Sequence, residues 1–289
     1  MISHFSERGG RDKLGQDTVQ QSTRRQRADA RIALGVERLG AATRVVRIAE
    51  TGSARLRLPK TEGPALEAVT INTGGGIAAG DRFATHIEVG GGAQLVVTTA
   101  AAEKIYRSEG DTAEIATTIR VANEGRLDWV PQETILYDAA RLRRSLEVAL
   151  EPGASALLFE ATVFGRAAFG ETMRSGAYAD RWRIRRGDRL VYADTLRITG
   201  VIADQLAKRT TAFGRRALAT IVYVASDAES RIEEARAALE DGESERGASA
   251  WDGLLAVRFL APDIETLRRD AARFMTLFRG QKLPRVWHL

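Results

Sequence analysis

The chain has 289 residues, of which 44% are hydrophobic and 28% charged, close to the averages of soluble globular proteins. It has no cysteine and three histidines, which excludes disulfides, thiolate nucleophiles and zinc sites built on sulfur. No apolar run approaches the ~18 residues needed to cross a membrane, and the first residues lack the apolar stretch of a signal peptide. We therefore expect a cytoplasmic protein with no membrane partner.

Residues 1–27 are polar, rich in glutamine and arginine, and without an apolar period, which predicts a disordered basic tail. This tail holds six basic and three acidic residues, so it accounts for three of the five net positive charges. The remaining 262 residues are nearly neutral, and composition does not demand a basic, nucleic-acid-binding face on them. We predict that residues 28–289 form a single β-rich domain.

From residue 28 onward the dominant signal is alternation with period two, which is typical of half-buried strands. Ala30, Ile32, Leu34 and Val36 fall on one face of the first such run. Similar runs follow at residues 83–89, 115–121, 146–150, 182–184 and 254–260, with glycine-bearing turns between them. The pattern predicts a mainly β protein with a large, many-stranded body.

Two late segments change to a helical period. Apolar residues share one face at 227–239, and they step by three and four at 263–278. Asp263 is placed to cap the second helix and Gly280 to end it. A few helices near the C-terminus therefore pack against the β body, in an α+β arrangement.

The glycine-rich run at residues 72–81 suggests a phosphate-binding loop. No Gly-Lys-Ser/Thr follows it, however, and it leads into a predicted strand rather than into a helix N-terminus. We interpret it as a tight turn in which glycines supply positive φ angles or close backbone approach.

Hydrolase motifs are also missing. The chain contains no Gly-x-Ser-x-Gly and no His-Glu-x-x-His, and its only mid-chain histidine, His86, lies on the polar face of a predicted strand. Serine-hydrolase and zinc-hydrolase chemistry are therefore disfavoured.

Any metal site must then use carboxylates, and nine acids are candidates: Asp81, Glu103, Asp128, Glu133, Asp138, Glu160, Glu171, Asp180 and Asp194. Paired carboxylates could also hydrolyse glycosides. Only 6% of the residues are aromatic, which is few for a sugar-binding cleft.

Some of these acids lie in apolar surroundings, where a buried carboxylate needs a cation or a hydrogen-bond donor. Glu133 and Asp138 belong to one apolar and aromatic stretch, and Glu160 and Glu171 flank another. The partner could be an internal arginine or a transient metal ion, and the sequence leaves both readings open. The arginines that could serve are Arg107, Arg141 and Arg166.

Five motifs, in order, resemble the UreD (also called UreH) family of urease accessory proteins. The resemblance covers nearly all of the region from about residue 30 to the C-terminus. The motifs are LEAVTINTGGG at 66–76, running on to residues 80–83, TTAAAEKIYRS at 98–108, LDWVPQETILYD at 127–138, FGRAAFGE at 164–171, and RG at 279–280 with LPRVW at 283–287. Lys104, Phe169 and Phe278 depart from the family's usual residues, and the basic tail has no counterpart in the family pattern.

The resemblance implies a β-helix-like fold and a non-catalytic urease maturation factor. It implies that the chain, with UreF and the GTPase UreG, binds apo-urease and assists nickel insertion, with nickel supplied by UreE and homodimerisation possible through the accessory complex. The resemblance also implies a scaffold with an internal acidic passage for transient Ni²⁺ and with no permanently bound cofactor. Carried over to this sequence, the acids expected to line the passage are Asp81, Glu133, Asp138 and Glu171.

Nickel is held tightly by imidazole and thiolate and loosely by carboxylate and water. A chain without cysteine and nearly without histidine suits passage of the ion better than storage. Two other functions stay as alternatives: a carbohydrate-active enzyme with two paired carboxylates, and a nucleic-acid binder that uses the arginines of the tail.

Overall fold

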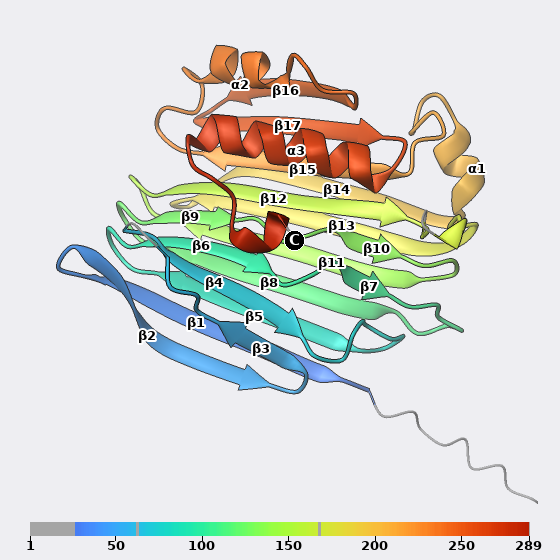
Figure 1. The fold of residues 1–289 in the computed structure, drawn as a ribbon, viewed down its shortest axis with the longest axis horizontal. Coiled ribbons are helices and arrows are strands. Elements are labelled where there is room, and N and C mark those ends of the chain that lie inside the picture. Colours follow the sequence, from blue (N-terminus) through green and yellow to red (C-terminus); the bar gives the residue numbers. More distant parts are fainter. Residues whose placement is uncertain (1–26, 62–63, 167–168, 289) are drawn as a thin grey trace, which may run out of the picture.

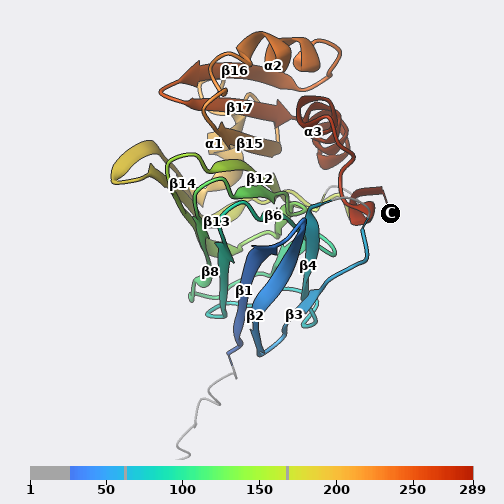
Figure 2. The same ribbon diagram turned by 90° about the vertical axis from the view of Figure 1, so that its left-hand side faces the viewer.

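The structure is a computed structural model that describes residues 27–61, 64–166 and 169–288. It is built mainly of strands, arranged as two sheets that face each other (Figures 1 and 2). The predicted tail lies outside the described residues except for Arg27, which pairs with Asp111. The division into a tail at 1–27 and a single domain at 28–289 stays a prediction.

Sheet A has seven described strands. In spatial order they are β14 (Arg189–Val201), β13 (Ser175–Arg186), β11 (Arg141–Leu150), β8 (Ala113–Val121), β5 (Arg82–Val89), β1 (Asp29–Leu39) and β2 (Ala42–Thr51). Sheet B has ten described strands. They are β16 (Glu245–Trp251), β17 (Leu254–Ala261), β15 (Ala217–Val224), β12 (Ser155–Phe164), β9 (Arg126–Trp129), β6 (Gln94–Thr99), β4 (Leu66–Asn72) and β3 (Ala54–Arg57), with β10 (Thr134–Leu136) beside β12 and β7 (Glu103–Ile105) beside β10.

The middle of the chain winds as a β-solenoid of about four turns, which confirms the predicted β-helix-like body. Strands β5, β8, β11 and β13 run parallel in sheet A and alternate along the chain with β6, β9 and β12 in sheet B. Each turn therefore adds one strand to each sheet. Residues of successive turns lie side by side in register, as Thr85 does with Thr117.

The core between the sheets follows from the period-two alternation. Ala30, Ile32, Leu34 and Val36 are all buried, as predicted, and pack with inward residues of sheet B. Burial of these inward side chains from both sheets stabilises the solenoid by a hydrophobic free energy proportional to the apolar area removed from water. This inner face also contains polar residues at one end, and these form the site described below.

Helix α3 (Ile264–Arg279) confirms the second predicted helix. The Asp263 side chain accepts a hydrogen bond from the Thr266 N–H at 2.8 Å, and Gly280 ends the helix at φ 63°. Its apolar face covers the outer face of sheet B (Figure 2), and Phe274 packs edge-on against Phe259 of β17.

The first predicted helix begins later than expected. Helix α2 is Ile232–Leu239, not 227–239, because residues 227–231 form a turn. The Ser230 hydroxyl donates to the Asp227 carbonyl, and the Tyr223 hydroxyl donates to the Asp227 carboxylate. Such local bonds compete with the helical ladder. A one-turn helix α1 (Ile202–Ala207) and a 3₁₀ helix (Arg285–His288) were not predicted, since both are too short to show a period.

The glycine-rich run is a tight turn that leads into β5, as predicted. Gly75 has φ 75°, which a residue with a side chain rarely adopts. A Cβ on Gly76 would lie 2.5 Å from Cζ of Tyr106, so only glycine fits beneath that ring. Within the described ranges, no helix is both long enough and apolar enough to pass through a membrane.

Candidate functional site

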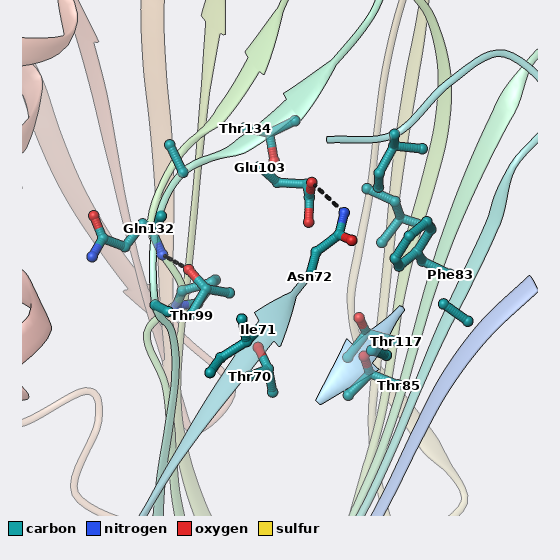
Figure 3. Close-up of a pocket in the computed structure, with 18 of the residues that line it drawn as sticks. Thr70, Ile71, Asn72, Phe83, Thr85, Thr99, Glu103, Thr117, Gln132 and Thr134 are labelled. Carbon is teal, nitrogen blue, oxygen red and sulfur yellow. Dashed lines mark hydrogen bonds between the residues drawn. The ribbon is translucent and has the colours of Figure 1, made fainter. Parts of the chain in front are cut away.

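A cavity of about 230 Å³ lies between the two sheets near the glycine turn (Figure 3). Its sheet A wall includes Phe83, Thr85 and Thr117, and its sheet B wall includes residues of β4 and of the chain before β7 and β10. Much of the lining offers oxygen or amide groups. The polar and charged residues of the lining are Thr70, Asn72, Thr85, Thr99, Glu103, Lys104, Thr117, Gln132, Thr134, Arg144 and Glu160.

Glu103 is one of two carboxylates that line this cavity. The parallel pairing of β7 with β10 fixes its backbone, and its N–H donates to the Glu133 carbonyl at 2.9 Å. The Asn72 side-chain amide donates to its carboxylate at 3.0 Å (Figure 3). Burial raises the pKa of Glu103 to about 7, and the bond from Asn72 offsets only part of that rise. Near neutral pH this group therefore exists in both its protonated and its ionised form.

The raised pKa of Glu103 predicts a pH dependence of stability. The folded-state pKa of Glu103, about 7, lies above its ordinary value of 4.5, so the folded protein binds this proton more tightly than the unfolded chain does. The stability that the protonated carboxyl contributes is complete below pH 4.5 and is lost as the pH rises to about 7. Glu103→Gln abolishes this loss, because the amide stays neutral at every pH. We expect its free energy of unfolding to exceed that of the wild type by about 2–3 kcal/mol at pH 8 and to match it within about 0.5 kcal/mol at pH 4. Urea unfolding at both pH values checks this, and an equal effect at both would contradict it.

Arg144 is a buried cation on the sheet A side of the same space. It donates two hydrogen bonds to Asp180, at 3.1 and 2.6 Å, and its Nε lies 2.7 Å from Oε2 of Glu160. All three side chains are 10% exposed or less, which places the cluster in the protein interior. Three hydroxyls complete the shell of the guanidinium: Thr134 at 3.1 Å, Thr162 at 3.1 Å and Tyr178 at 2.7 Å.

Glu160 is the second carboxylate of the cavity. Burial raises its pKa to about 7; the charge of Arg144 opposes this rise and the charge of Asp180 adds to it. The Trp129 indole N–H donates to Oε1 at 3.3 Å, whereas Oε2 has no aligned hydrogen bond despite its closeness to Arg144. With one guanidinium beside two carboxylates, this end of the cavity has a surplus of acid, and one oxygen is only partly satisfied.

The site can therefore hold protons or weakly bind a hard or borderline cation through oxygen. Two carboxylates that titrate near neutrality exchange protons readily, and carboxylate, amide and hydroxyl oxygens are moderate ligands for divalent ions. Over the part of the chain that the structure describes, no three His, Asp or Glu side chains gather closely enough to hold a metal ion together.

The four acids predicted from the sequence lie elsewhere, and none of them lines this cavity. Asp81 is buried in the glycine turn, where its carboxylate accepts from the N–H groups of Ala28 and Ala78, each at 2.8 Å. Glu133 turns outward from sheet B toward α3 and pairs with Arg268 at 3.4 Å.

The other two predicted acids are neighbours. Oε1 of Glu171 accepts from the Asp138 N–H at 3.0 Å, and each carboxylate has its own arginine, Arg166 for Glu171 and Arg174 for Asp138. The bond from Arg166 lowers the pKa of Glu171. Burial alone would raise the pKa of Asp138, but bonds from Arg174 and from the Ser175 N–H lower it overall. Both stay ionised at neutral pH, and their place along a passage stays a prediction.

Arg144 was not predicted from the sequence. The arginines predicted as possible internal partners are Arg107, Arg141 and Arg166, and Arg166 does pair with Glu171. The missed signal lies in the alternation of β11, where Leu142, Arg144 and Leu146 share the buried face. A charged residue at an inward position predicts a buried counter-charge. Glu103 and Glu160 were among the nine candidate acids, but their convergence depends on different turns of the solenoid.

Comparison with known proteins matches residues 28–288 to the family described as UreD urease accessory protein. The chain is similar to the urease accessory protein UreD of Azorhizobium caulinodans, with 54% identity over 266 residues that cover 92% of this chain and 98% of the relative. It is 54% identical to that of a Methylobacterium species over 91% of this chain and 96% of the relative. It is 52% identical to that of Xanthobacter autotrophicus over 91% of each chain.

Proposed function

The chain belongs to the UreD urease accessory protein family, and we propose that it helps to insert nickel into apo-urease as a scaffold with an internal passage. Proteins of this family serve in urease maturation and are not themselves catalysts. We therefore interpret the two cavity carboxylates as cation ligands rather than as the acid and base of a glycosidase.

The observation that supports the passage is the acid-bearing cavity between the sheets. A passage must attract the ion and then release it, so its sites must be weak. Oxygen ligands bind nickel less tightly than imidazole and thiolate do. Glu103 and Glu160, with pKa values of about 7, hold protons part of the time near neutrality, and a proton competes with the ion for the same oxygens. This competition weakens binding further and favours release.

The proposed assembly contains four other components. UreF and the GTPase UreG bind the scaffold, apo-urease receives the nickel, and UreE supplies the ion. Nickel is then a transient cargo of this chain rather than a bound cofactor. Homodimerisation through the accessory complex is part of the same proposal.

We keep Asp81, Glu133, Asp138 and Glu171 in the proposal as acids that line the passage outside this cavity. Asp138→Asn and Glu171→Gln each remove one negative charge from a pair that is already joined by hydrogen bonds. We expect either variant to assemble with UreF and UreG while the urease it matures contains less nickel, by about twofold or more. Metal analysis of the purified urease measures this. Glu234→Gln, which removes the charge from another arginine-paired acid, is the control, and full nickel occupancy in the Asp138 and Glu171 variants would discard their assignment.

The function as a whole is tested by co-expressing urease and its accessory set with and without this chain. We expect the urease made without it to have little activity and little nickel. Unchanged activation in its absence would contradict the proposed function.

A further inference from the structure

The two sheets differ in what covers their outer faces. Helix α3 packs on the outer face of sheet B, whereas no described segment packs on the outer face of sheet A (Figure 2). The outward positions of sheet A are therefore left uncovered by the described segments, and the strand registers determine which side chains lie together there.

Between β8 and β14 this surface is strongly basic. The register aligns Arg120 of β8 with Ala149 of β11 and Arg185 of β13. A second row runs across β8, β11, β13 and β14 and consists of Glu114, Arg143, Ala179 and Arg197. Seven arginines and two glutamates occupy the outward positions, and we call this set the basic face. It consists of Arg120, Arg141, Arg143, Arg181, Arg183, Arg185 and Arg197 with Glu114 and Glu147.

Internal pairing neutralises only part of this charge. Arg143 pairs with Glu114 at 2.7 Å, and Arg181 pairs with Glu147. Among the described residues, Arg120, Arg185 and Arg197 form no ion pair with an acid. Arg181, Arg183 and Arg185 follow one another on the same side of β13, about 7 Å apart. On the neighbouring strand β11 only one acid lies opposite these three arginines, Glu147 opposite Arg183, so most of their positive charge is not offset within the sheet.

We propose that the basic face docks against an acidic surface of apo-urease. This inference rests on the proposed function, because the protein that receives the nickel must contact the scaffold that delivers it. A surplus of positive charge on one flat face accelerates encounter with a negatively charged partner and orients it.

The side chains between the arginines favour a protein partner over a nucleic acid. Most of the intervening outward residues are small, among them Ala116, Ser145, Ala149 and Ala179, and Leu190 is the larger apolar residue opposite Arg185. The face therefore allows close approach of a folded surface. No aromatic residue occupies an outward position on β8, β11, β13 or β14, whereas single-stranded nucleic acids are bound by stacking on aromatic side chains.

The test reverses three charges that form no ion pair in the part of the chain that the structure describes. The variant Arg120→Glu/Arg185→Glu/Arg197→Glu changes six units of charge, two at each position, on exposed side chains. Its association with purified apo-urease, in the presence of UreF, is measured at low salt and at about 1 M salt. We expect the association rate at low salt to fall about tenfold or more relative to the wild type, and the difference to vanish at about 1 M salt, where charges are screened beyond ~3 Å.

Lys60→Glu/Arg209→Glu/Arg285→Glu makes the same six-unit change at exposed positions off the face and should leave the rate within about twofold. An equal effect of both triple variants would overturn the proposal, as would a loss of UreF binding in place of urease binding. Tighter binding of the wild type to a single-stranded RNA than to apo-urease would overturn it in favour of a nucleic-acid partner. If urease activation requires the chain but tolerates the reversal, the docking inference fails while the proposed function stands.

Discussion

Replacing Arg144 by methionine is expected to destabilise the protein by about 3–5 kcal/mol, enough to prevent most of it from folding at 37 °C. The reason is the loss of the cation that lies 2.6 Å from Asp180 and 2.7 Å from Glu160. Removal leaves two buried carboxylates close together without a counter-charge. Urea unfolding followed by tryptophan fluorescence measures the loss, because Trp129 and Trp182 donate to these same two carboxylates.

The triple variant Arg144→Met/Glu160→Gln/Asp180→Asn separates the charge effect from a packing effect. If uncompensated charge causes the destabilisation, neutralising both acids should restore at least half of the lost free energy, since a neutral replacement of a buried ion network is often tolerated. A triple variant as unstable as Arg144→Met alone would show that the guanidinium acts through its shape and its hydroxyl contacts instead.

Filling the cavity is the second large change. Thr85→Leu/Thr117→Leu places two larger apolar side chains on neighbouring inward positions of β5 and β8 (Figure 3). Neither hydroxyl has a hydrogen-bond partner in the described part of the chain, so the change removes no internal bond and alters no charge. We expect the accessory complex to form as before but the rate of urease activation to fall about fivefold or more, because a divalent ion with its ligands no longer fits.

The control for this variant is Thr51→Leu/Thr211→Leu, which makes the same chemical change at two exposed positions away from the cavity and from the basic face. It should activate urease within about twofold of the wild-type rate. Normal activation by Thr85→Leu/Thr117→Leu, in a complex of normal composition, would show that the ion does not use this space.

Features encoded over a few consecutive residues were predictable from the sequence. The inward positions of β1 follow from simple alternation, and the bounds of α3 follow from Asp263, which caps it, and Gly280, which ends it. The tight glycine turn was predictable for the same reason, since Gly75 adopts a positive φ. In each case the physical cause lies within one turn or one strand.

The site depends on contacts between distant residues, and a single sequence does not reveal those. Glu160 on β12 meets Arg144 of β11 across the sandwich. Glu103 reaches the same cavity from β7, which pairs with β10, and β10 in turn pairs with β12. The acids predicted from the resemblance are those that belong to family motifs. The acids that line the cavity are instead those that different turns of the solenoid bring together in space.

The most direct test of a passage between the sheets is the number of nickel ions per urease active site after maturation by wild-type and cavity-filled complexes. Purified apo-urease is incubated with each complex, UreE-bound nickel and GTP, then separated and analysed for metal. The account predicts near-complete occupancy with the wild type and with Thr51→Leu/Thr211→Leu, and only a small fraction with Thr85→Leu/Thr117→Leu. Equal nickel content in all three ureases would contradict it.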